Sequence, residues 1–502
     1  MTSIRSKMAT GALWMVLAKL AERSLGFIST LILARVLVPH DFGIVAMAMT
    51  FVALAEMLGA FGFDATLIQK QTTERAHWDT AWTFDIILGV VVALVLTLGA
   101  HPVAAFFKEP ALVQVLPVLA LGSVALGFQN IGVVAFRAEM RFDREFRFQI
   151  AKKLIGFVIT VPLAIKLDSY WALVIGQTTG RFVATALSYW VHPYRPRLSL
   201  AGAADLFGFS KWLLAINTIS YLKERSSDWV IGRLAGPASL GAFNVSYELA
   251  SLPSTELIAP INRAVFPAYA KLAKESPEAL RVEYLSVIAM IMLIAAPAVL
   301  GLAAVAPLLV PVMLGPNWSQ AVPVLMLLGF FGFTNIIQSN AQAAYLALGR
   351  ADIPAKLNAV HVVVQLGALV WFTRLYGVVG SAIGYLITAA VMIPPSVGVV
   401  LRMLHIRVSE FFAQIWRPIA AAAVMYIAVL LFVRSAATAN LNTFAQLLAL
   451  VGAVGMGAII YISLTAVFWW LCGKPPGAEQ IVINRVTPIV TRLVPRRDTL
   501  SA

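Results

Sequence analysis

Long apolar runs separated by short polar intervals dominate the chain from residue 14 to residue 472. A membrane-spanning helix needs about 20 mostly apolar residues, because the hydrocarbon core of a bilayer is about 30 Å thick. Fourteen runs approach or meet this length and predict fourteen spanning helices. Their ranges are 14–36, 42–63, 80–99, 112–136, 150–167, 170–190, 212–234, 241–265, 284–306, 321–345, 355–376, 378–401, 418–433 and 445–472.

The composition indicates an all-α, polytopic membrane protein. Hydrophobic residues make up 60% of the 502 residues and charged residues 12%, against about 45–50% and about 25% in soluble domains. Such a chain cannot cover a water-facing surface with charge, so a soluble enzyme and a disordered chain are both excluded. The lone Cys472 excludes a disulfide framework or a Cys-based metal site. We expect no metal and no cofactor.

Positive charge follows the alternation of the predicted helices. If both termini are cytoplasmic, most Lys and Arg residues fall in cytoplasmic loops. The outer loops then hold only Arg35, Lys108, Lys166, Arg374 and Arg434. This bias is the positive-inside pattern, and it predicts a multi-pass protein with both termini in the cytoplasm. The net charge of +14 therefore reflects orientation in a membrane and predicts no nucleic-acid partner.

An internal repeat divides the chain into two halves. Four residues recur 198 positions later, namely Trp14, Arg35, Pro39 and Gly43 as Trp212, Arg233, Pro237 and Gly241. Because each half holds six helices, an even number, the halves share one orientation and flank a central cavity. We expect an N-lobe at 1–190, a cytoplasmic linker at 191–211, a C-lobe at 212–403, two further helices at 404–472 and a basic cytoplasmic tail at 473–502.

Basic residues inside the predicted spans are candidates for substrate binding, since a charge at the bilayer centre costs about 2.5–3.5 kcal/mol. Lys19 and Arg23 share one face of the first helix, and Lys223 lies at similar depth in the seventh. Facing each other across a cavity, they would suit an anionic substrate such as a diphosphate. Arg225 and Arg263 complete the predicted set, although Arg225 equally fits an internal ion pair with Asp228.

Acidic residues inside the spans are candidates for energy coupling, because a carboxylate in a transport cavity can bind and release a proton or cation. The candidates are Glu22, Glu56, Asp85, Asp228 and Glu248. Each acid could instead form a structural ion pair with a basic residue.

Four arginines between the fourth and fifth predicted spans are spaced as one helical stripe. They are Arg137, Arg141, Arg144 and Arg147. The spacing predicts an interfacial helix that binds anionic membrane lipids.

Sequence features of enzymes are missing. Gly473-Lys474 is the one Gly-Lys pair in the chain, and it lacks the other residues of a phosphate-binding loop. No long outer segment carries paired carboxylates, which argues against a glycosyltransferase or polymerase. The sequence therefore predicts that the chain is not an enzyme.

Three segments resemble the Wzx-type polysaccharide flippases. They are Leu33-Ala34-Arg35-Val36-Leu37 with Pro39-His40-Asp41-Phe42-Gly43; Phe136-Arg137 through Met140-Arg141-Phe142; and Tyr247 with Leu249-Ala250, Pro253 and Phe266-Pro267-Ala268. The resemblance covers about residues 5–470. It points to the WzxC-like branch of the multidrug/oligosaccharidyl-lipid/polysaccharide (MOP) exporter superfamily, whose fold is similar to that of multidrug (MATE) exporters.

This resemblance implies translocation of undecaprenyl-diphosphate-linked oligosaccharides across the bacterial inner membrane by alternating access. It also implies polymerase or export machinery as partners. The segment Arg23-Ser24-Leu25-Gly26-Phe27 is similar to a lipid II flippase motif, which implies a cavity role for Arg23. The lipid II flippases have cavity arginines in their second and eighth helices. At the corresponding places this chain has the region of Glu56 and Glu248, so its anion site must be built differently. The alternatives are a multidrug or cation antiporter of the same superfamily and a membrane glycosyltransferase.

Overall fold

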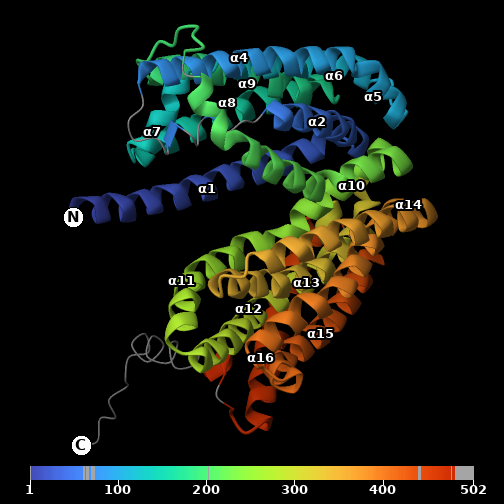
Figure 1. The fold of residues 1–502 in the computed structure, drawn as a ribbon. Coiled ribbons are helices and arrows are strands. Elements are labelled where there is room, and N and C mark those ends of the chain that lie inside the picture. The colour runs from blue at the N-terminus through green and yellow to red at the C-terminus, as the bar shows by residue number, and fades with distance from the viewer. Residues whose placement is uncertain are drawn as a thin grey trace, which may run out of the picture. The chain divides into compact units, whose positions relative to one another are not determined.

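The computed structural model describes the backbone of residues 2–59, 63, 67–68, 74–201, 203–438, 442–475 and 477–480. Within these ranges it describes all side chains except those of residues 2–13, 16, 58–59, 204–220, 223 and 438. Every regular element in the described ranges is a helix (Figure 1). This confirms the all-α prediction.

The chain divides into two compact units. Unit 1 comprises Met1–Asn244 with Met313–Trp318, and unit 2 comprises Val245–Val312 with Ser319–Ala502. This division does not test the predicted lobe boundaries, which stay a prediction.

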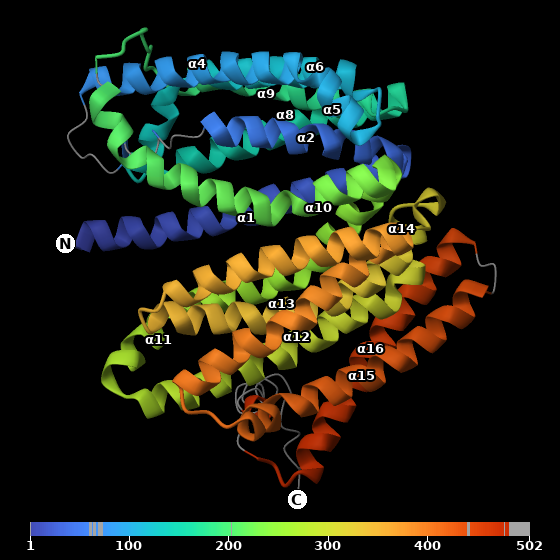
Figure 2. The same ribbon diagram turned by 45° about the vertical axis from the view of Figure 1, so that its right-hand side comes forward.

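Unit 1 is a bundle in which α4, α6, α8 and α9 lie side by side (Figures 1 and 2). Its elements are α1 (Thr2–Val36), α2 (Pro39–Gly59), α4 (Arg75–Leu98), α5 (Ala100–Phe107), α6 (Leu112–Gly127), η1 (Ile131–Val134), α7 (Ala135–Ala138), α8 (Phe142–Leu167), α9 (Trp171–Val191), α10 (Ala203–Leu252) as far as Asn244, and η3 (Pro316–Trp318).

Unit 2 packs α13 against α14 and α15 against α16 (Figure 2). Its elements are the π-helical turn η2 (Pro253–Ile258), α11 (Ala259–Glu275), α12 (Pro277–Met313), α13 (Ala321–Ala347), α14 (Asp352–Met403), α15 (Val408–Thr438) and α16 (Thr443–Leu471).

Within the described residues, the predicted runs lie largely on helices, but several boundaries differ. The runs 212–234 and 241–265 share α10, which is broken at Gly236 (φ 83°) and followed by the π-helical turn at Pro253. The runs 355–376 and 378–401 share α14, broken at Tyr376 and Gly377. Among the described residues, seven helices, or up to eight with one bent pair, are long and apolar enough to span a membrane. The chain is therefore a membrane protein, and the count of fourteen spans stays a prediction.

The bent pair lies where the sequence predicts one span over 112–136. The described helix α6 ends at Gly127, and the chain turns by 68° before η1 and α7. Met140 then adopts a left-handed conformation (φ 57°) between α7 and α8. The prediction of one continuous arginine stripe is therefore wrong. Arg137 lies in α7, while Arg144 and Arg147 lie in α8.

The repeated Pro-Gly segments meet inside unit 1. A Cβ on Gly43 of α2 would overlap the carbonyl of Pro237, and a Cβ on Gly241 of α10 would overlap the carbonyl of Pro39. Each glycine thus lets its own helix approach the other copy's proline, as two elements related by an approximate two-fold axis would do. This reciprocal contact supports the internal repeat.

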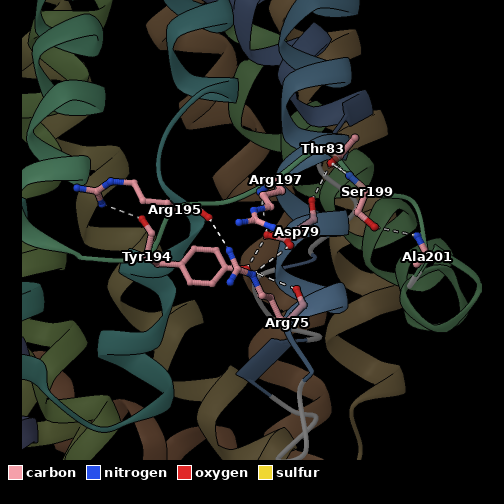
Figure 3. A network of polar contacts seen from close by, with 8 residues as sticks. All are labelled: Arg75, Asp79, Thr83, Tyr194, Arg195, Arg197, Ser199 and Ala201. Carbon is pink, nitrogen blue, oxygen red and sulfur yellow. Dashed lines mark hydrogen bonds and ion pairs between the residues drawn. The ribbon is translucent and has the colours of Figure 1, made fainter.

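Asp79 fixes the chain segment that follows α9 (Figure 3). Its carboxylate, in a largely buried residue of α4, accepts hydrogen bonds from the Tyr194 hydroxyl (2.7 Å) and the Arg197 amide (3.0 Å). One turn along α4, the hydroxyl of Thr83 accepts from the amide of Ser199 (2.9 Å). The first part of the predicted linker 191–211 is therefore bound to unit 1.

Candidate functional site

Two adjoining polar cavities lie within unit 1. The first, about 380 Å³, is lined by α2, α4, α6, η1, α7 and α8. The second, about 450 Å³, is lined by α1, α2, α6, α8 and α9. Four residues line both: Leu126, Gln129, Gln149 and Lys152. These cavities contain three of the predicted acids, Glu56 and Asp85 in the first and Glu22 in the second.

Close helix crossings position the polar groups of the first cavity. A Cβ on Gly89 of α4 would lie 2.8 Å from the carbonyl oxygen of Ser123, and a Cβ on Gly127 would lie 2.5 Å from the carbonyl oxygen of Asp85. Small residues of this kind allow helix backbones to approach inside a membrane. The α4–α6 crossing therefore places Asp85 and Ser123 on neighbouring walls.

An ion pair between Glu56 and Arg181 lies where the two cavities meet. Arg181 donates through both terminal nitrogens to the two carboxylate oxygens of Glu56, and Ser123 donates its hydroxyl to the same carboxylate (2.8 Å). Glycine at position 122 makes room for the arginine, because a Cβ there would lie 2.9 Å from Cδ of Arg181. Both charged side chains are about a quarter exposed. A half-buried pair of this kind neutralises two charges that are costly to leave alone.

Residues in the first turns of α8 line both cavities. The side-chain amide of Gln149 donates to the carboxylate of Glu145 (2.9 Å), and the ammonium of Lys152 lies 5.3 Å from the ring centre of Phe148. Acidic, basic and amide groups thus alternate along this stretch of helix.

A second polar cluster in unit 1 surrounds Asp228 on α10. Its buried carboxylate accepts hydrogen bonds from Arg225 (3.1 Å) and from the hydroxyl of Thr50 (3.1 Å). The hydroxyl of Tyr221 donates to the carbonyl of Thr50, and Trp229 donates to that hydroxyl in turn. Arg225 and Asp228 therefore form the internal pair that the sequence allowed, and this cluster joins α2 to α10.

Two of the predicted basic residues lie on α1 of unit 1. Lys19 and Arg23 have exposed side chains on α1, and Arg23 has a polar partner. The side chain of Lys223 lies outside the described residues.

Two predicted residues lie in unit 2. Glu248 is exposed near the end of α10, and Arg263 of α11 donates to the carbonyl of Ala259 in its own helix (3.3 Å).

Most of the polar groups that line the cavities are not among the residues predicted from the sequence. Arg181 could have been found, because it is a charge inside the span 170–190, and Glu56 is the partner that such a charge requires. Glu145 lies outside the predicted span 150–167 and Lys152 lies at its edge, so a rule on charge inside spans does not single them out. Gln129 and Gln149 are uncharged, so no rule on buried charge identifies them.

Solved structures show what class of protein has this fold. The lipid II flippase MurJ, in an inward closed conformation, has a TM-score of 0.71 at 12% identity, covering 91% of this chain and 99% of that one. A multidrug resistance MATE family transporter of the MOP superfamily, inward-facing, has a TM-score of 0.57 at 17% identity, covering 76% and 95%. The chain thus shares its fold with MurJ and with this MATE family transporter.

The sequence comparisons then give the family. Residues 32–323, more than half of the chain, match the polysaccharide biosynthesis protein family, and the chain belongs to it. The lipopolysaccharide biosynthesis protein WzxC of Escherichia coli (strain K12) is 28% identical over 83% of this chain and 85% of its own length. The teichuronic acid biosynthesis protein TuaB of Bacillus subtilis (strain 168) is 23% identical over 92% and 96%. These matches confirm the resemblance and the prediction of a transport protein rather than an enzyme.

Proposed function

We propose that this protein is a flippase that moves an undecaprenyl-diphosphate-linked oligosaccharide from the cytoplasmic to the periplasmic leaflet of the bacterial inner membrane. The proposal rests on family membership together with one structural observation: polar, charge-lined cavities lie among helices that are otherwise apolar. A saccharide needs such surroundings to cross a bilayer, while its prenyl chain can stay in lipid.

The diphosphate would bind to basic groups at mid-depth. Lys19, Arg23 and Lys223 are the proposed ligands, because each carries a positive charge inside a predicted span. Arg225 has a structural part in this scheme, since it already pairs with Asp228. Arg263 and Glu248 stay secondary candidates.

Energy coupling would use an acid in the unit 1 cavities. Protonation of Glu56 would cancel its charge and release Arg181, so one proton would change the charge of the cavity wall. Asp85 and Glu22, which line the same pair of cavities, are the alternative proton or cation acceptors. Alternating access would then be driven by the proton or cation gradient.

Depletion of the protein in its host tests this proposal directly. We expect lipid-linked oligosaccharide to accumulate on the cytoplasmic leaflet, because synthesis continues while translocation stops. Arg23→Ala and Lys223→Ala should each prevent rescue by the plasmid-borne gene, whereas Lys166→Ala, in a predicted outer loop, should rescue fully. Unchanged surface polysaccharide on depletion, with drug sensitivity instead, would favour the multidrug antiporter.

Orientation and partners complete the proposal. Both termini would be cytoplasmic, as the distribution of Lys and Arg predicts. Exposed arginines such as Arg147 at the start of α8 would contact anionic lipid headgroups. On the periplasmic side the product would pass to polymerase and export machinery.

A further inference from the structure

The charges that line the unit 1 cavities are nearly balanced. The first cavity holds the carboxylates of Glu56, Asp85 and Glu145 beside the cations of Arg137 and Lys152. The second cavity holds the carboxylate of Glu22 beside the cations of Lys152, Lys153 and Arg181, and Arg181 neutralises Glu56. A ligand that enters therefore meets both signs of charge at short range.

This balance argues against two of the ligands that a transporter of this fold could carry. In the first cavity, a diphosphate would be repelled by the carboxylates of Asp85 and Glu145, and a lipophilic cation by Arg137 and Lys152. Among the described lining residues of the first cavity, Phe148 is the one aromatic ring, and the ammonium of Lys152 lies over it. A flat apolar drug would thus find no open aromatic face.

The same lining is well suited to hydroxyl groups. Gln129 and Gln149 line both cavities, and Gln177 lines the second. A side-chain amide offers both hydrogen-bond donors and an acceptor to a sugar hydroxyl. A carboxylate accepts the hydrogen bond that a hydroxyl donates. Among the residues that the structure describes, no hydrogen bond is seen for the side-chain amide of Gln129, whereas Gln149 uses one N–H on Glu145.

The size of the cavities agrees with a small polar ligand. Volumes of about 380 and 450 Å³ lie near the lower end of the range for small-molecule sites, roughly 300–1,000 Å³. They can hold one or two sugar rings, but not a long glycan chain.

We propose that these adjoining cavities bind sugar residues of the lipid-linked substrate, with Gln129 and Gln149 as the residues that hydrogen-bond to sugar hydroxyls. This inference rests on the proposed flippase function and deepens it. The two polar parts of the substrate would then bind at different places. The sugar would bind in the unit 1 cavities, and the diphosphate would bind to Lys19, Arg23 and Lys223. The protein would then select its substrate by the glycan as well as by the diphosphate.

The test compares two probes on purified full-length protein in lipid nanodiscs. The first is the lipid-linked oligosaccharide purified from depleted host membranes, and the second is undecaprenyl diphosphate without sugar. The variants are Gln129→Leu and Gln149→Leu, with Gln114→Leu as the matched control, since Gln114 is exposed on α6 and lines neither cavity. Gln129→Asn, which keeps the amide and shortens the side chain, serves if the leucine variants fold poorly.

We expect the wild type to bind the glycosylated lipid more tightly than the bare diphosphate lipid. Each cavity variant should reduce that advantage by about 5- to 30-fold, the value of one or two hydrogen bonds. Binding of undecaprenyl diphosphate, and both affinities of Gln114→Leu, should stay unchanged.

Two results would overturn the sugar site while leaving the flippase function intact. One is equal affinity of the wild type for both lipids, and the other is an equal loss for both lipids in the glutamine variants. Failure of depleted membranes to accumulate any lipid-linked oligosaccharide, or binding of neither lipid, would overturn the proposed function itself.

Discussion

The Glu56–Arg181 pair of unit 1 and two ion pairs of unit 2 have different surroundings. In unit 1, Arg181 pairs with Glu56 beside two polar cavities. In unit 2, Arg281 meets Glu410 where α12 and α15 begin, and Arg350 meets Asp352 at the start of α14.

Between its helix ends, unit 2 is mostly apolar. Two clusters of buried hydrophobic residues fill it, one around Tyr284 and Ile288, the other around Leu308 and Met425. The buried polar groups there include uncharged ones, such as the amide of Asn340 bonded to Asn262. The comparison contrasts a charged pair beside polar cavities in unit 1 with extended buried apolar clusters in unit 2.

The largest expected effect on stability is in unit 2. Arg417 and Glu479 form a two-point ion pair (2.8 and 3.3 Å) with both side chains about 6% exposed. Arg417→Leu leaves Glu479 buried without its partner, which costs about 3–5 kcal/mol. Thermal unfolding of the purified protein should show a large drop in Tm, while the remaining folded protein still binds lipid-linked oligosaccharide.

The double variant Arg417→Leu/Glu479→Leu is the control for this effect. It should recover most of the lost stability, because no buried charge is left unpaired. If Arg417→Leu alone left Tm unchanged, the buried pair would contribute nothing to folding.

A smaller effect is expected at the helix crossing in unit 1. Gly241→Leu places a side chain against the carbonyl of Pro39, and overpacking of this kind costs about 1–3 kcal/mol. Gly367→Leu is the matched control, since a Cβ at Gly367 in α14 meets nothing within 4 Å. Equal unfolding temperatures for the two variants would show that the crossing tolerates a side chain.

The cavity pair should matter more for transport than for folding. Arg181→Gln removes the charge opposite Glu56 but keeps hydrogen-bonding groups in a half-buried place, so we expect a loss of about 1–2 kcal/mol. Surface polysaccharide in a complemented deletion strain should nevertheless fall at least about tenfold. Arg417→Leu should instead lower Tm strongly and reduce surface polysaccharide less than Arg181→Gln does. Similar losses of surface polysaccharide in the two variants would contradict the difference proposed between the units.

The smallest effect concerns pH. A hydrogen bond from Arg281 (2.6 Å) holds the pKa of Glu410 below its ordinary value of 4.5. The folded state therefore binds fewer protons than the unfolded state near that pH. The stabilisation is present above about pH 4.5 and is lost as the pH falls through the lower pKa of the folded state. Glu410→Gln should flatten the fall in Tm between about pH 5 and pH 3.

The helices were predictable because membrane spans are long, apolar and internally hydrogen-bonded, and the described parts of the predicted runs lie largely on helices. Breaks within them were harder to predict. The chain turns by 68° after Gly127, and Met140 adopts a left-handed conformation although position 140 is neither Gly nor Asn, so the residue type there does not signal the break.

The candidate site was predictable only in part. Charge inside a span singled out Glu56 and Asp85, but charge alone cannot tell a ligand-binding group from a structural pair. Arg225 and Asp228 are such a pair. The pairing of Glu56 with Arg181 joins residues 125 positions apart, which no local spacing rule relates.

The crossing of the two repeat copies has a consequence for how such a chain can diverge. Each copy's glycine is accommodated by the other copy's proline, so a change at Gly43 is felt at Pro237, and a change at Gly241 is felt at Pro39. After a duplication the two halves can acquire different sequences almost everywhere else. At this crossing the two halves cannot change independently. Positions 39, 43, 237 and 241 are therefore expected to covary among related sequences.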